Sequence, residues 1–173
     1  MTIDRAPAPD PRAASLAGRI AMAIAAISAR SEAIAAAAPL AGDSRLGPDE
    51  DAWGPREVLA HCAEAVPFWH GELERILAGD PAAGPTPFGR APDDTARIGI
   101  LTRDRTLPAI VLIDRIGRDG AAITARIRRL TTAELDHVGR HPAWGDLPLH
   151  GVLERTLAGH LEGHVRQLDE LLG

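Results

Sequence analysis

Apolar residues recur at helical spacing in four stretches of the chain. These stretches cover about residues 11–38, 55–78, 107–130 and 149–172. In each of them the apolar positions return every three or four residues, which places them on one face of a helix. No stretch shows the alternation of apolar and polar residues that predicts a strand. The pattern therefore predicts an all-α fold, a four-helix bundle.

Capping residues and glycines indicate where these helices begin, end or bend. Asp10 is suited to be the N-cap of the first helix, with Pro11 at its first position. Gly117 and Gly120 interrupt the third apolar stretch, so we expect a bend or a break there. Thr131 is followed three residues later by a glutamate, a capping-box pattern that predicts a short further turn of helix.

Two long connections, at residues 42–54 and 79–106, separate the predicted helices. The second contains four prolines and is longer than an ordinary connector. Loops of that length are usually lids, crossovers or disordered segments. The crossover interpretation predicts a bundle with long crossover loops and not a simple up-down-up-down order. A chain of 173 residues can bury one proper core. We therefore predict a single domain over residues 11–173, after a flexible N-terminal segment at residues 1–10.

Composition and charge exclude several classes of protein. A formal net charge of −5 argues against a nucleic-acid binder, which needs a basic surface to neutralise phosphates. No apolar run approaches the 18 residues of a membrane span. The apolar residues 20–29 are similar to a signal-peptide core, but the helical period continues through Arg30 and Glu32 and favours a helix of the fold. The single cysteine, Cys62, excludes an internal disulfide framework, and we expect a cytoplasmic protein.

Two histidines, His160 and His164, continue the apolar stripe of the last predicted helix. A neutral imidazole is costly to bury without a partner, and two on one core face need a reason. Their spacing of four residues places both rings on the same side of the helix, one turn apart. A metal ion is one partner that both rings can bind.

A third histidine, His61, lies within the apolar arc of the second predicted helix, whereas we expect His70 to face solvent or a loop. Together with His160 and His164, it would present three neutral nitrogens to one ion. Zinc, nickel and iron all accept imidazole ligands. Three protein ligands leave a coordination position open, as in a reactive site, whereas a structural site has four. The alternative is that the three are core histidines without a metal.

Four short motifs occur in a characteristic order: W-x-x-R-E-V-L-A-H at residues 53–61, L-T-T-A-E-L at 130–135, H-P-x-x-G at 141–145 and H-x3-H-x-x-Q-L at 160–168. In this order they resemble the DinB-like superfamily, over nearly the whole chain from the first helix onward. The resemblance implies a four-helix bundle with a three-histidine metal site, one ligand from the second helix and two from the fourth. It assigns the site to His61, His160 and His164.

The characterised relatives in that superfamily include thiol-dependent transferases and isomerases that use mycothiol, bacillithiol or glutathione. The resemblance thus implies a metal-dependent enzyme acting on a small molecule, by thiol-dependent S-transfer or isomerisation, with a low-molecular-weight thiol as cofactor. Hydrolysis by activated water is the alternative reaction. A non-enzymatic, metal-binding or stress-associated bundle is a further interpretation. The alanine-rich helix faces also make a homodimer plausible.

Residues beyond the three histidines offer weaker candidates for chemistry. Glu64, one turn after the histidine of the second helix, is a weak candidate for a base or a partner of the metal site, and an ordinary exposed helix glutamate is the favoured interpretation. His141 and His150 either approach the open end of the site or are bystanders. Trp144 and Phe88 lie in loops, where they either line the mouth of a pocket or cap the core.

Overall fold

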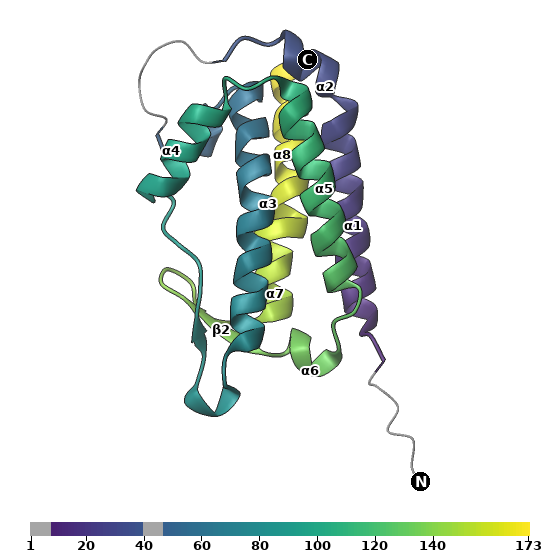
Figure 1. The fold of residues 1–173 in the computed structure, drawn as a ribbon, viewed down its shortest axis with the longest axis vertical. Coiled ribbons are helices and arrows are strands. Elements are labelled where there is room, and N and C mark those ends of the chain that lie inside the picture. The colour runs from purple at the N-terminus through teal and green to yellow at the C-terminus, as the bar shows by residue number, and fades with distance from the viewer. Residues whose placement is uncertain (1–7, 40–46) are drawn as a thin grey trace.

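The long helices pack into a four-helix bundle (Figure 1). A computed structural model describes residues 8–39 and 47–173, so most of the expected flexible segment at residues 1–10 lies outside the described residues. Three of the bundle helices are α1, α3 and α5, and the fourth is a continuous rod of three segments, α7, η3 and α8. Their bounds are Pro11–Ala29, Pro55–Ala78, Ala109–Ile127, Leu149–Leu153, Glu154–Ala158 and Gly159–Leu172.

The bundle does not have the simple up-down-up-down order, as its long connections predicted. In Figure 1, α1 and α8 run upward, whereas α3 and α5 both run downward. The segment between α3 and α5 returns along the outside of the bundle to make this possible. Both α1 and α3 pack against α5 and α8, so each helix has two neighbours around a shared core.

Two expectations about helix ends and bends were wrong. The first helix ends at Ala29 and not near residue 38, because Arg30 leaves helical geometry (φ −95°, ψ 6°), and the short α2 (Ser31–Ala36) follows. The third helix, α5, is uninterrupted at Gly117 and Gly120. A Cβ atom at Gly120 would lie 2.2 Å from Ile24 Cδ1. This glycine thus permits close packing of α5 on α1 and does not break the helix.

The expectation of no strands was also wrong. The described residues contain a small sheet of order β1-β2-β3, in which β1 is parallel to β2 and β2 is antiparallel to β3. The hairpin of β2 and β3 places the H-P-x-x-G motif in its turn, where Gly145 has a φ of +73°. The bounds of the strands are Thr86–Pro87, Val138–His141 and Gly145–Pro148.

Short helical segments occupy the connections between the bundle helices. The missed helix α4 (Thr95–Asp104) lies within the long connection before α5, and the 3-10 turn η1 (Glu50–Ala52) directly precedes α3. A second 3-10 turn, η2 (Pro81–Ala83), follows α3. The capping box at Thr131 is formed and starts α6 (Thr132–Leu135), as predicted.

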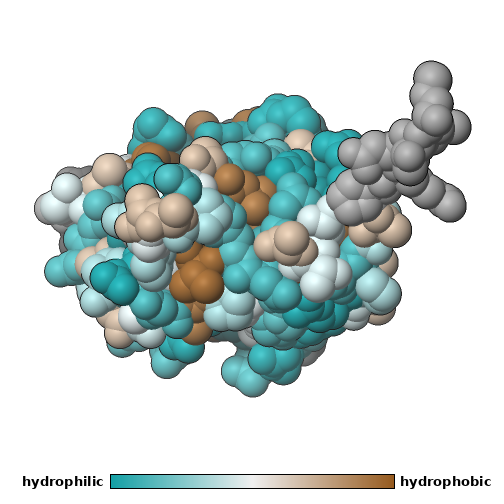
Figure 2. Space-filling view, turned by 90° about the horizontal axis from the view of Figure 1, so that it is seen from below, coloured by the Kyte–Doolittle hydropathy of each residue, from teal (hydrophilic) through white to brown (hydrophobic). Residues whose placement is uncertain are grey.

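The core is aliphatic and reaches into the small sheet, where Phe88 is buried. Among the described helices, α1 is long and apolar enough to cross a membrane by length and composition alone. In the fold it packs as a core helix, because the side chains of Leu16, Ile20 and Ile27 are buried. Figure 2, seen from the end that bears α6, shows a mainly hydrophilic surface on which hydrophobic residues form separate areas. No described feature tests the expected homodimer.

Candidate metal centre

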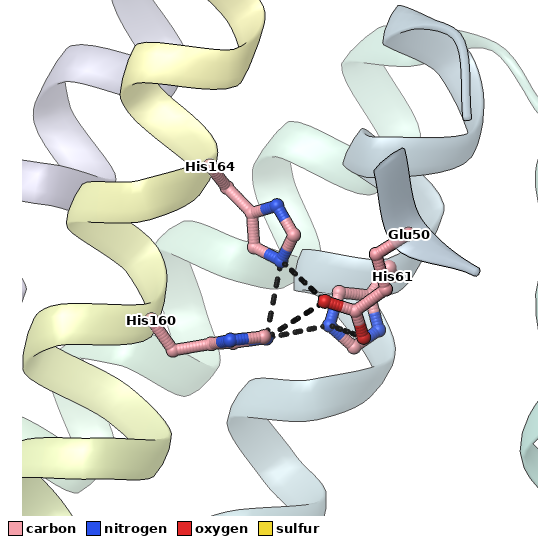
Figure 3. Close-up of side chains that lie close together, drawn as sticks. All are labelled: Glu50, His61, His160 and His164. Carbon is pink, nitrogen blue, oxygen red and sulfur yellow. Dashed lines mark hydrogen bonds and ion pairs between the residues drawn. The ribbon is translucent and has the colours of Figure 1, made fainter. Parts of the chain in front are cut away.

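His61, His160 and His164 converge in the bundle, although 99 residues separate the first two (Figure 3). His61 comes from α3, and the other two come from α8. The Nε2 atom of His160 lies 2.8 Å from Nε2 of His61 and 3.1 Å from Nε2 of His164. The three rings therefore turn the same nitrogen toward a common point, as the sequence pattern led us to expect.

A carboxylate that the sequence reasoning missed, Glu50 of η1, completes this group (Figure 3). Its Oε1 atom lies 3.6 Å from His61 Nε2, and its Oε2 atom lies 3.7 Å from His164 Nε2 and 4.0 Å from His160 Nε2. One ligand atom from each of the four residues lies within 4.8 Å of every other. We define Glu50, His61, His160 and His164 as the His/Glu cluster.

Gln167 orients one of the histidines and ties it to the carboxylate segment. Its Oε1 atom lies 2.8 Å from Nδ1 of His164 and accepts the Nδ1 proton, which leaves the lone pair of that ring on Nε2. The amide nitrogen of Gln167 donates to the carbonyl oxygen of Glu50 at 2.6 Å. One side chain thus fixes the tautomer of His164 and the position of η1.

The other contacts of the cluster come from Arg97 of α4 and from Trp53. Arg97 donates a hydrogen bond to Oε1 of Glu50, and its guanidinium lies 5.1 Å from the centre of the Trp53 ring. Trp53 packs edge-on against His61, with ring centres 5.2 Å apart. His61 Nδ1 has no hydrogen-bond partner among the described residues, so packing against Trp53 sets the orientation of this ring.

Burial keeps the three imidazoles neutral. It lowers the pKa of His61 well below the usual value of 6.5, and the neighbouring histidines lower it further. The same causes lower the pKa of His160 to about 3, and burial also lowers the pKa of His164. Neutral imidazole is the form that binds a metal ion.

The donor set fits a divalent cation. In a neutral ring, Nε2 of His160 has either one proton or one lone pair, so it forms only one good hydrogen bond although it faces two nitrogens. A cation would instead accept lone pairs from all three rings, and the carboxylate of Glu50 would add an oxygen donor and a negative charge. His61, His160, His164 and Glu50 are therefore the residues that would hold the ion.

The helix that bears two of the histidines contains a π-helical turn, η3, directly before them. Such turns are rare and are frequent at functional sites. Arg19 of α1 bridges the turn by pairing with Glu154 at its start, at 2.7 Å, and with Glu162 beyond it, also at 2.7 Å. This pair of contacts holds the turn and the segment around His160 against α1.

A pocket of about 240 Å³ lies beside the cluster, and His61, His160 and Glu50 contribute to its wall. The side chain of His160 is 27% exposed, whereas those of His61 and His164 are 4% and 5% exposed. A second hollow shares Glu50 and His160 on another side. The cluster is thus reached from solvent at His160 and at Glu50, whose side chain is 32% exposed.

The weaker candidates are distributed around this pocket. Glu64 is buried and pairs with Arg90, and it is not part of the His/Glu cluster. His141 and Trp144 line the pocket. His150 lines none of the described pockets around the cluster. His70 is 30% exposed and lies outside the cluster, as expected.

Fold and cluster together define an all-α bundle with a histidine-rich candidate metal centre. A sequence model of the DinB superfamily matches residues 28–168, so the chain belongs to the DinB superfamily. Among solved structures it is similar to YfiT from Bacillus subtilis, described as a probable metal-dependent hydrolase with an unusual four-helix bundle topology. The TM-score is 0.69 at 16% identity, over 98% of this chain and 91% of that one, which shows a shared fold. A search of the curated proteins finds no match.

Proposed function

We propose that this chain is a metal-dependent hydrolase that acts on a small molecule in the pocket beside His160. The observation that supports the proposal most is that three neutral imidazoles and one carboxylate converge at the wall of a pocket. The described function of YfiT points in the same direction. A divalent cation held there would act as a Lewis acid and would lower the pKa of a neighbouring water or thiol.

The residues around the pocket have different roles in the proposed site. His61 and His164 are buried and bind from the interior, whereas the partly exposed His160 faces the substrate pocket. Arg97 donates a hydrogen bond to Oε1 of Glu50, so Oε2, which faces His160 and His164, is the oxygen placed to bind the ion. Gln167 keeps both this carboxylate segment and His164 in place.

The test compares stripped and reloaded protein on a panel of small esters, amides and lactones. The chain is freed of metal by a chelator and reloaded with zinc, nickel or iron(II). We expect hydrolysis only after reloading, loss of both metal and activity in His160→Gln, and full activity in the matched control His70→Gln. Equal rates for stripped and reloaded protein would overturn the proposal.

The same assay separates hydrolysis from thiol chemistry, which the family resemblance predicts and which stays a prediction. Each reloaded sample is run with and without glutathione, bacillithiol or mycothiol. Hydrolysis without any thiol supports the proposal. A reaction that strictly requires a thiol, with the thiol found in the product, would contradict hydrolysis and favour S-transfer.

A further inference from the structure

Three arginines line the pocket beside the His/Glu cluster, and two of them are neutralised. Arg90 pairs with Glu64, and Arg97 pairs with Glu50. Within residues 8–39 and 47–173, no carboxylate lies within ion-pair distance of the third, Arg155. The pocket thus contains one guanidinium whose charge no side chain of the described chain balances.

Arg155 is held at the pocket wall by aromatic stacking. Its guanidinium lies 4.3 Å from the centre of the Trp144 ring. Trp144 in turn stacks on the buried His141, with ring centres 3.7 Å apart and planes 10° apart. His141 is the last residue of β2 and Trp144 lies in the turn of the β2–β3 hairpin, so the hairpin positions Arg155, which belongs to η3. A stacked guanidinium keeps its in-plane N–H donors available to a ligand.

The π-helical turn explains why Arg155 faces the same pocket as His160, five residues later. In a regular α-helix, five residues rotate a side chain by about 140° beyond a full turn. The i to i+5 bonding of a π-turn instead brings such residues close to one face. Both residues accordingly line this pocket.

The pocket also has an apolar part, which suits a hydrophobic body. Its wall includes Trp69, Pro92 and Ala143, together with Trp144. Among the described residues, ion pairs balance Arg90 and Arg97 but not Arg155, which leaves one positive charge at the pocket wall. A ligand with one negative charge and an apolar body matches both features.

We infer that the substrate of this pocket is a small organic carboxylate with an apolar body, and that Arg155 determines this specificity by pairing with the carboxylate. The inference deepens the proposed function, on which the identification of the ligand as a substrate rests. The carboxylate is the group recognised by Arg155, and the bond to be cleaved lies elsewhere in the molecule, toward His160.

The test measures the binding of benzoate and of benzamide, its uncharged analogue of equal shape, to the full-length chain by calorimetry. Stripped and zinc-loaded protein are both used, so that the readout does not depend on activity. We expect benzoate to bind more tightly than benzamide in both forms, and Arg155→Gln to weaken benzoate by about tenfold without changing benzamide. Arg155→Lys should retain most of the preference, since it keeps the charge.

Arg128→Gln is the matched control, because Arg128 is an exposed arginine at the end of α5 and lines none of the described pockets around the cluster. Equal or undetectable binding of the two probes overturns the inference. A preference for benzoate that requires zinc and survives Arg155→Gln also overturns it, because the metal would then hold the carboxylate. Zinc content, measured on the same samples, tests the proposed function separately.

Discussion

Replacing Glu50 by glutamine tests whether its carboxylate, which the sequence did not predict, contributes to the binding of a metal ion. The substitution preserves shape and removes one negative charge that lies 3.6–4.0 Å from three imidazole nitrogens. A pair of unit charges about 4 Å apart interacts by about 4 kcal/mol at an effective dielectric constant of about 20. The net effect is smaller, because the carboxylate is 32% exposed and already pairs with Arg97. We expect zinc affinity to fall by 10- to 100-fold, about 1.4–2.8 kcal/mol.

The assay is competition for zinc against a chromophoric chelator at pH 7.5, with wild type, Glu50→Gln and Asp51→Asn side by side. Asp51 is the matched control because it lies in the same 3-10 turn, is exposed and is not part of the cluster. Its substitution should leave the affinity within about twofold of wild type. If Glu50→Gln also stays within twofold while its melting temperature is unchanged, Glu50 is only the ion-pair partner of Arg97, and its assignment to the metal centre is wrong.

Three further predictions concern stability and reactivity. Because the folded pKa of His160 is lowered to about 3 from 6.5, the metal-free protein should lose stability as the pH falls below about 6.5, by about 1.4 kcal/mol per pH unit for this group. Denaturant unfolding at pH 7.5 and pH 5 should therefore show that the free energy of unfolding falls by about 2 kcal/mol more in wild type than in His160→Gln. An equal fall in both proteins would refute the lowered pKa of His160. Gly117 has open space around its Cα and Gly120 does not, so Gly120→Ala should be less stable than Gly117→Ala by about 1–3 kcal/mol in thermal unfolding, and equal stabilities would contradict the close packing. Cys62 is fully buried, and burial raises the pKa of its thiol to about 12. Iodoacetamide should therefore label this cysteine at pH 8 only after unfolding. Rapid labelling of the folded protein would show that the core around Cys62 opens, which contradicts the prediction.

Prolines and glycines at helix ends were sufficient to predict the bounds of the helices that they mark. The second helix was predicted at residues 55–78, and α3 has these bounds, because Pro55 and Gly79 mark its two ends. The strands escaped detection because each has two to four residues and depends on pairing across the chain, as between Thr86 and Gly139. The helix α4 was hidden in a proline-rich connection where only Ile98 and Leu101 repeat at helical spacing on a core-facing side.

The candidate site shows the same division between local and long-range information. Helical periodicity is a local property, so it placed His61, His160 and His164 on core faces before the fold was known. Glu50 lies between two other acidic residues in a connection, and nothing in that run distinguishes it. Arg97 and Gln167 hold Glu50 in the cluster, and these two residues come from distant segments that contact Glu50 only in the folded chain. The ligation of a metal ion by these residues stays a prediction.

The π-helical turn η3 changes the direction in which the side chains of α8 point, relative to those of α7 in the same continuous helix. The half before it, α7, follows the strand β3 directly, and the half after it, α8, presents two histidines to the cluster. One extra residue in the turn offsets the second half by about 100° relative to an uninterrupted helix. Deleting one residue of the turn would restore a regular helix and turn the histidine face away from α3 without changing any ligand. The convergence of the His/Glu cluster is therefore encoded by a residue count as much as by residue identity, and an alignment of its four residues alone would overlook that requirement.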